Sequence, residues 1–186
     1  MKRSLIVEGG RVGLFPLQES HLNSVILSWF QDRDLTQFFS TTFKRFNEES
    51  LRTLVEAKTP ESPSRAYGIV RLYDDRLIGV VTVGPIRPVH QLCDVVTLIG
   101  EESARGQGLA GETVCLASYL AFKKHGARKL TTAMFAGNVP ARKAYASAGW
   151  FEEAELRDHL IVNGHAMAMI LMSCFPESLR DHVAFP

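Results

Sequence analysis

Apolar side chains recur along this chain at two intervals, one typical of helices and one of strands. A helix over about residues 20–31 is predicted by an N-cap candidate, Ser20, and by apolar positions three and four residues apart: Leu22, Val25, Ile26 and Trp29. Asn47, followed by two glutamates, predicts a second helix that runs to about residue 58. The proline-containing segment 59–64 is expected to be a loop.

Shorter apolar runs bounded by turn residues predict strands at residues 4–8, 11–17, 66–73, 77–83, 92–99, 130–135, 150–159 and 165–174. Helical spacing predicts two further helices over residues 107–124 and 139–148, which end near Gly126 and Gly149. The last two strands are joined by Asn163-Gly164, a strong hairpin signal. This order predicts the α/β class, with a mixed, mostly antiparallel central sheet flanked by helices.

Composition narrows the classes of protein that fit. A chain of 186 residues, 46% of them hydrophobic, is expected to form a single domain over residues 1–186. A net charge of +1 argues against a protein that binds nucleic acid, and no segment has the length of a membrane span. The three cysteines have no metal-ligand spacing, so we expect no metal and a cytoplasmic location.

A glycine-rich segment stands between the strand predicted at 92–99 and the following helix. Such a turn presents unpaired backbone N–H groups at the positive end of a helix dipole. It is therefore a candidate site for a phosphate or pyrophosphate group. Its residues are Arg105, Gly106, Gln107, Gly108, Leu109 and Ala110.

A second candidate segment begins at Asn138, between the strand at 130–135 and the helix at 139–148. Pro140 suits the first helical turn, and Tyr145 lies two turns after Asn138, on about the same face of the helix. A capped helix with a tyrosine in the core would give the same pattern.

Together the two segments resemble the GCN5-related N-acetyltransferase (GNAT) superfamily. Arg105-x-x-Gly108-x-Ala110 matches its coenzyme A pyrophosphate loop, and the second motif of the family is matched by Asn138, Ala144-Tyr145 and Gly149-Trp150, although the last pair is more often Gly-Phe. Gly111-Glu112, the segment 155–158 and the Asn163-Gly164 turn are most similar to the branch of ribosomal-protein N-terminal acetyltransferases.

The resemblance implies transfer of an acetyl group from acetyl-CoA, as co-substrate, directly to a primary amine. It also makes a homodimer a candidate assembly. The acceptor is a protein N-terminus or a small molecule such as an amino sugar, polyamine or antibiotic. A sensor that binds acyl-CoA without catalysis is the alternative. In the family, backbone N–H groups on the strand before the loop polarise the thioester carbonyl, which here means those around Leu98, Ile99 and Gly100.

The resemblance also assigns roles to single side chains. Tyr145 is the candidate general acid, and Asn138 is expected to contact the pantetheine arm or to cap its helix. Related enzymes often use a glutamate as base on the strand before the loop, where this chain has Val95 with Asp94 beside it. Since strand side chains alternate, Asp94 faces the opposite side from Val95. The candidates for the base are Asp94 after a register shift, a water chain, or one of His90, Glu101 and Glu102.

The acceptor wall is expected from the first two helices, their connection and the closing hairpin. Four phenylalanines there line either this wall or the core: Phe38, Phe39, Phe43 and Phe46. Arg71, Arg87 and His90 are either scattered surface charges or contacts for an acidic acceptor.

Overall fold

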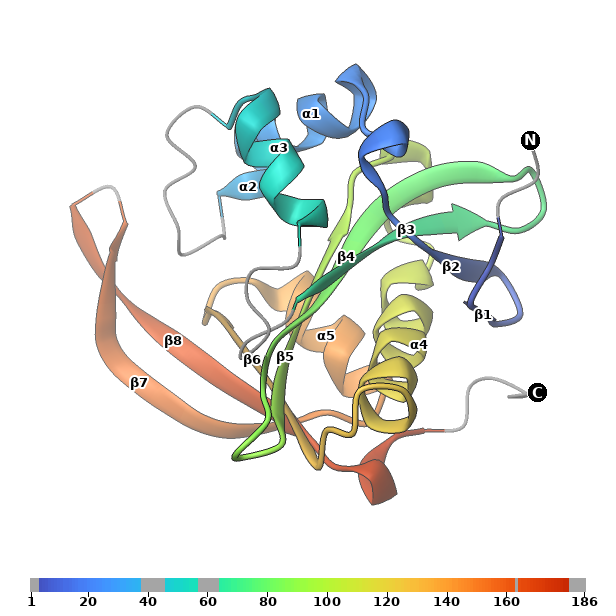
Figure 1. Ribbon diagram of the computed structural model, residues 1–186. Coiled ribbons are helices and arrows are strands. Elements are labelled where there is room, and N and C mark those ends of the chain that lie inside the picture. The colour runs from blue at the N-terminus through green and yellow to red at the C-terminus, as the bar shows by residue number, and fades with distance from the viewer. Residues whose placement is uncertain (1–3, 38–45, 57–63, 163, 181–186) are drawn as a thin grey trace.

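The computed structural model describes residues 4–37, 46–56, 64–162 and 164–180. Within these ranges, eight strands form one sheet in the order β1-β2-β3-β4-β5-β6-β8-β7 (Figure 1). Neighbouring strands are antiparallel except for β5 and β6, which are parallel. The strands are β1 (Val7–Glu8), β2 (Val12–Pro16), β3 (Arg65–Arg71), β4 (Arg76–Arg87), β5 (Leu92–Ile99), β6 (Lys129–Phe135), β7 (Phe151–Val162) and β8 (His165–Cys174). The predicted class, a mixed and mostly antiparallel sheet flanked by helices, is confirmed.

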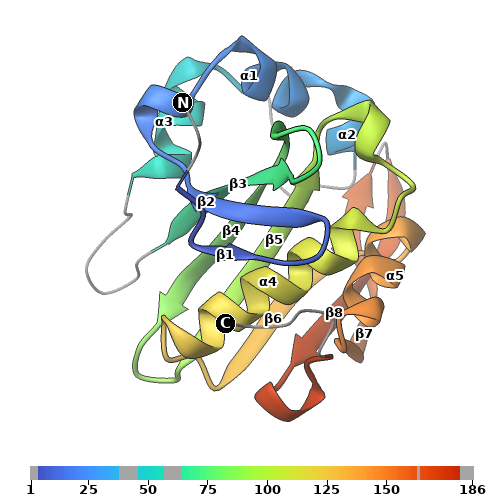
Figure 2. The same ribbon diagram turned by 90° about the vertical axis from the view of Figure 1, so that its right-hand side faces the viewer.

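The helices lie on both faces of this sheet. Figure 2 shows α4 lying across one face, with α5 beside it, while α1, α2 and α3 are grouped together away from α4. The α-helices are α1 (Ser24–Gln31), α2 (Arg33–Thr36), α3 (Glu48–Val55), α4 (Leu109–Lys123) and α5 (Val139–Ser147). Short 3₁₀ turns are η1 (Glu19–His21), η2 (Glu102–Ala104) and η3 (Pro176–Ser178). Among the described residues, no helix has both the length and the apolar character needed to cross a membrane.

Two apolar clusters hold the layers together, because successive strand residues point to opposite faces. Ile69 and Val81 pack in the cluster under α4, whereas their neighbours Val70 and Val80 pack in the cluster under α1 and α3. Phe46 belongs to the second cluster and stacks on Phe30 with ring centroids 4.5 Å apart, so it is a core residue. Phe38, Phe39 and Phe43 lie outside the described residues.

The N-terminal end of the first helix differs from the expectation. Ser20 is not the N-cap, because residues 19–21 form η1 and the chain is extended again at Leu22. Asn23 caps α1 instead, with its side chain accepting from the N–H groups of Val25 and Ile26 at 3.0 and 3.1 Å. The predicted cap of α3 is correct, since Asn47 accepts from Ser50.

Two other boundaries shift for physical reasons. The strand expected at 77–83 continues through Gly84-Pro85 to Arg87, because a bulge between Val83 and Ile86 lets pairing with β5 resume. The helix expected from residue 107 begins at Leu109, since Gly108 has a left-handed backbone with φ of 74° and acts as its N-cap.

Gly100, directly after β5, lies against a ring of α1. A Cβ built there would be 2.0 Å from Trp29 Cδ2, far inside van der Waals contact. We expect Gly100→Ala to lower the free energy of unfolding by about 1–3 kcal/mol, because the Trp29 ring has to move. Urea unfolding of the variant measures this change. Gly126→Ala is the control, because it strains a backbone with positive φ but places its Cβ where no atom lies within 4 Å. An unchanged unfolding midpoint for Gly100→Ala would contradict the close packing.

Candidate active site

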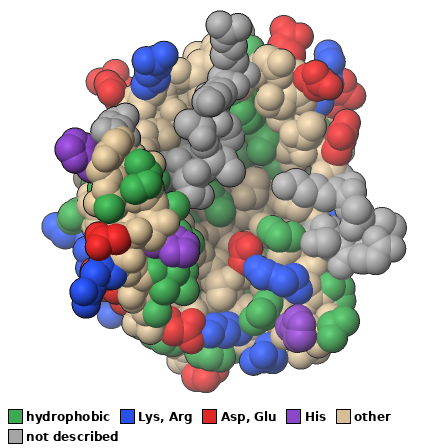
Figure 3. Space-filling model, turned by 90° about the vertical axis from the view of Figure 1, so that its left-hand side faces the viewer, with side chains coloured by type: hydrophobic (Ala, Val, Ile, Leu, Met, Phe, Trp, Pro, Cys, Tyr) green, Lys and Arg blue, Asp and Glu red, His purple; other side chains and the backbone are tan. Residues whose placement is uncertain are grey.

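The β5 and β6 strands run parallel for three residue pairs and then diverge. Their pairing stops at Asp94↔Thr131, whereas β4 stays paired with β5 as far as Ile99. A cleft of about 810 Å³ passes through this divergence. Its lining comes from both sides of the sheet and includes Phe30, Asp34, Leu35 and Leu54 from α1–α3, and Ala110, Val114, Ala141 and Tyr145 from α4 and α5. Figure 3 views the side of the β7–β8 hairpin and shows a hollowed surface with charged and hydrophobic side chains next to one another.

The glycine-rich loop forms one end of the cleft, as the sequence predicts. Gly106 and Gly108 both have positive φ, 72° and 74°, which a side chain would strain. The backbone N–H groups of Gly106, Gln107 and Gly108 donate no hydrogen bond to the part of the chain that the structure describes. They stand at the N-terminus of the 15-residue helix α4, which makes the loop a suitable cradle for an anion.

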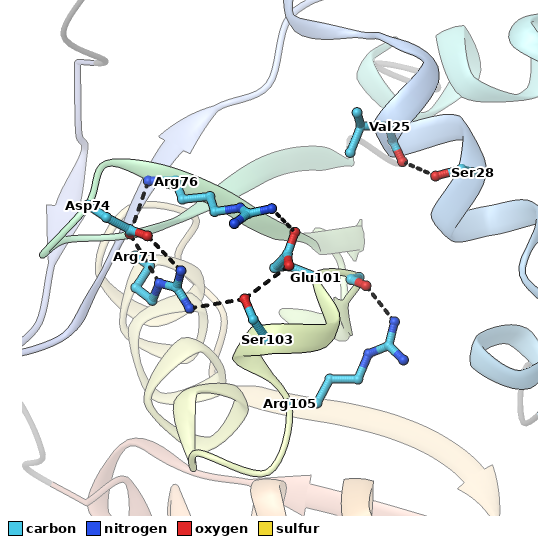
Figure 4. A network of polar contacts seen from close by, with 9 residues as sticks. Val25, Ser28, Arg71, Asp74, Arg76, Glu101, Ser103 and Arg105 are labelled. Carbon is cyan, nitrogen blue, oxygen red and sulfur yellow. Dashed lines mark hydrogen bonds and ion pairs between the residues drawn. The ribbon is translucent and has the colours of Figure 1, made fainter.

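Side chains hold this loop in place from two sides. Arg105 Nη2 donates to the Gly100 carbonyl at 2.5 Å, so this guanidinium ties the loop to the end of β5 (Figure 4). Gln107 Nε2 donates to the Ser103 carbonyl at 2.6 Å, and Arg11 Nη1 donates to the Gln107 carbonyl at 2.9 Å. These contacts fix the shape of the loop.

Glu112, in the first turn of α4, joins this helix to the β1–β2 hairpin. Its carboxylate is 8% exposed and accepts from Arg11 N at 2.7 Å, Arg11 Nε at 2.9 Å and Val12 N at 3.2 Å. A carboxylate in the first turn also complements the positive end of the helix dipole. Glu112 and Arg11 thus connect the start of the chain to the anion cradle.

A second polar network supports the turn before the loop. Arg71 is 4% exposed, pairs with Asp74 at 2.6 Å and donates to Ser103 Oγ at 3.4 Å (Figure 4). Ser103 in turn donates to Glu101, which also pairs with Arg76 at 3.0 Å. Arg71 and Glu101 are therefore engaged in this network. Glu101 is not among the described residues that line the cleft, so it is poorly placed to act as a base.

Tyr145 reaches from α5 into the gap between β5 and β6. Its side chain is 5% exposed, lies edge-on to Trp150, and donates through Oη to the Val95 carbonyl at 2.9 Å. Burial raises the pKa of Tyr145 to about 12, although the nearby Thr97 and Thr132 groups partly offset the rise. The phenol thus keeps its proton at neutral pH at the place where the strands part.

The direction of the backbone N–H groups on β5 follows from one printed contact. Gly100 N donates to the Ile78 carbonyl at 2.9 Å, so this N–H faces β4. Because directions alternate along an antiparallel strand, Leu98 N–H also faces β4, while Thr97 and Ile99 N–H face the gap. Of the three residues expected to polarise a thioester, only Ile99 presents its N–H to the cleft.

Asp94 lies on the other face of β5 from Val95, at the last residue pair before the gap. Its two oxygens both accept from Arg87 Nη2 at 2.9 Å, and Thr131 Oγ1 donates to Oδ1. The carboxylate borders the cleft and is 28% exposed. Arg87 is therefore the ion-pair partner of Asp94. His90, another residue considered for the site, lies in the turn that follows β4.

Asn138 caps α5, since its Oδ1 accepts from Ala141 N at 3.3 Å. The residue also lines the cleft, so the cap does not remove it from the site. Thr97 and Arg11 are site residues that the sequence did not indicate. Thr97 could have been found from its place two residues after Val95, on the same face of the strand. Arg11 carries no local signal, because its partners lie about 100 residues away.

Comparison with known proteins agrees with this geometry. The family model of the acetyltransferase (GNAT) domain matches residues 11–150. No curated protein matches the chain in sequence.

Solved structures share the fold. A spermidine N-acetyltransferase from Vibrio cholerae, in complex with CoA and spermine, has a TM-score of 0.78 and 18% identity, over 90% of this chain and 96% of that one. A ribosomal-protein-S5-alanine acetyltransferase from Vibrio fischeri has a TM-score of 0.73 and 18% identity, over 94% and 98%. Mycobacterium smegmatis RimJ, in complex with CoA-disulfide, has a TM-score of 0.72 and 18% identity, over 93% and 89%. Because the family model covers most of the chain, this protein belongs to the GNAT acetyltransferases, a family of acyltransferase enzymes.

Proposed function

We propose that this protein transfers the acetyl group of acetyl-CoA directly to a primary amine, with both substrates bound at once. The observation that carries the proposal is the place of Tyr145, whose phenol stands in the gap between β5 and β6. The same cleft contains the loop of unpaired N–H groups at the start of α4. A coenzyme gripped at that loop has a direct path to the phenol.

Different residues of the cleft bind different parts of acetyl-CoA. The N–H groups from Gly106 to Ala110 bind the pyrophosphate, with Arg105 fixing the loop. Ile99 N–H polarises the thioester carbonyl, whereas Gly100 N–H donates to the Ile78 carbonyl of β4. Asn138 borders the path of the pantetheine arm.

Tyr145 acts as the general acid. The neutral amine nitrogen bonds to the carbonyl carbon, the C–S bond breaks, and its electron pair leaves on sulfur. The proton of the Tyr145 phenol passes to that sulfur, which gives the free thiol of coenzyme A. The proton lost by the amine leaves through the base and solvent, and the phenolate regains a proton from solvent.

Asp94 is our candidate base, because it is a carboxylate at the edge of the same gap. We expect Asp94→Asn to lower kcat/KM by about 100-fold or more, since an amide cannot accept the proton of the amine. Thr131→Val is the matched variant, because it removes a partner of Asp94 and keeps the carboxylate. An Asp94→Asn enzyme with full rate would contradict this assignment and favour a water chain as the base.

The acceptor end of the cleft favours a cationic amine. Asp34 of α2 and Asp94 of β5 both border it, while Arg87 is paired with Asp94. The related structures suggest two kinds of acceptor, a polyamine or a protein N-terminus. An amino sugar or an antibiotic is a further candidate acceptor, because it also offers a primary amine.

A panel assay tests the proposal. The full-length protein is incubated with acetyl-CoA and polyamines, N-terminal peptides or amino sugars, and release of coenzyme A thiol is followed. We expect turnover with at least one cationic amine. Tight binding of coenzyme A without turnover on any amine would favour the acyl-CoA sensor instead.

A further inference from the structure

A hydroxyl group beside Tyr145 has no role in the mechanism as stated so far. Thr97 lies on β5, two residues after Val95, and so points to the face of the sheet on which Tyr145 packs. Its Oγ1 atom is buried and has no hydrogen-bond partner among the described residues. The residue borders the cleft at the divergence of β5 and β6.

An orphaned hydroxyl is unusual in a protein interior. Leaving such a group without a partner costs about 1–3 kcal/mol, and valine has the same shape without this cost. Because β5 is otherwise rich in valine and leucine, packing alone does not account for a threonine here. An unpaired hydroxyl next to a reacting group is explained when its partner arises during the reaction.

Two features place that partner at the Tyr145 oxygen. Both the hydroxyl and the backbone N–H of Thr97 favour the charged form of this phenol, as does Thr132 from β6. At rest, the phenol proton is directed at the Val95 carbonyl. When the phenol gives its proton to sulfur, its oxygen becomes an anion in a buried place, where a neutral donor is worth most.

We propose that the Thr97 hydroxyl donates a hydrogen bond to the Tyr145 oxygen as it becomes a phenolate, and so makes Tyr145 a competent acid. Thr97 is a positioning residue, because it acts through Tyr145 and keeps its own proton. This inference rests on the proposed acetyl transfer and on the acid role of Tyr145.

The test uses Thr97→Val and Thr97→Ser in the full-length enzyme with the best acceptor of the panel. Thr97→Val removes the hydrogen bond to the charged phenolate, and we expect this to lower kcat by about 10- to 100-fold. Thr97→Ser should recover most of it. The KM for acetyl-CoA should change little, and the melting temperature should stay or rise, since valine removes an unpaired polar group. Thr113→Val is the matched control, because its buried hydroxyl bonds to the Leu109 carbonyl within α4.

A double-mutant cycle separates this inference from the proposed function. In a Tyr145→Phe background, Thr97→Val should cost nothing further. The inference is overturned if Thr97→Val keeps full kcat, if serine fails to restore it, or if the loss is the same in both backgrounds. A Tyr145→Phe enzyme with full rate would overturn the acid assignment itself.

Discussion

Replacement of Tyr145 by phenylalanine is expected to lower kcat by about 100- to 10,000-fold, while the KM values for acetyl-CoA and the amine change little. The ring still packs on Trp150, but the thiolate leaves without a proton donor. Steady-state kinetics with the acceptor found in the panel measure the loss. Tyr67→Phe is the matched control, because it removes a buried phenol that contacts His125 Nε2 at 3.0 Å, away from the cleft. Equal losses of kcat in the two variants would contradict the acid role.

The pH profile gives a second measure of the same group. Burial raises the pKa of Tyr145 to about 12, so the acid form persists well above the ordinary tyrosine pKa of about 10. Loss of activity from ionisation of Tyr145 is therefore absent between pH 7 and about pH 10. An alkaline limb in this range that Tyr145→Phe removes would show that the phenol ionises more easily than its burial implies.

Glu112→Ala is expected to lower both the stability of the fold and the affinity for coenzyme A. The change leaves the Arg11 and Val12 N–H groups without their acceptor and removes the partner of the Arg11 guanidinium. We expect a loss of about 3 kcal/mol in the free energy of unfolding, since Glu112 is buried although Arg11 is 55% exposed. With Arg11 released, its hold on the Gln107 carbonyl is lost and the anion cradle loosens.

Urea unfolding and calorimetric titration with coenzyme A measure these two effects. Glu152→Ala serves as the control, because it breaks a comparable ion pair with Arg142 on an exposed part of α5 and β7. A Glu112→Ala protein with unchanged stability would show that the hairpin is held by its strand pairing alone. Reduced stability with unchanged affinity would mean that the loop keeps its shape without Arg11.

The parts that could be predicted from sequence are those set by neighbouring residues. The strand at 92–99 coincides with β5, and Asn47 and Asn138 cap their helices through bonds to residues three positions on. The anion cradle is also local, because its glycines and the following helix are contiguous. Such features depend on backbone geometry that a few residues fix.

The parts that could not be predicted depend on pairing between distant segments. The Arg11–Glu112 contact joins residues about 100 positions apart, and nothing near Arg11 points to it. Which N–H groups of β5 face the gap depends on its register with β4, which a pattern of valines leaves open. The same holds for Asp94, whose engagement by Arg87 and Thr131 depends on the neighbours that β5 has on each side.

The early separation of β5 from β6 leaves an opening between the two faces of the sheet. One side of the opening is bordered by α4 and α5, and the other by α1, α2 and α3. In the proposed reaction, acetyl-CoA would therefore enter from one side of the sheet and the amine from the other, and the two would meet only at the reacting atoms. Since the two sides are built from separate stretches of chain, the helices before residue 56 can change during evolution to suit a new amine without rebuilding the coenzyme grip.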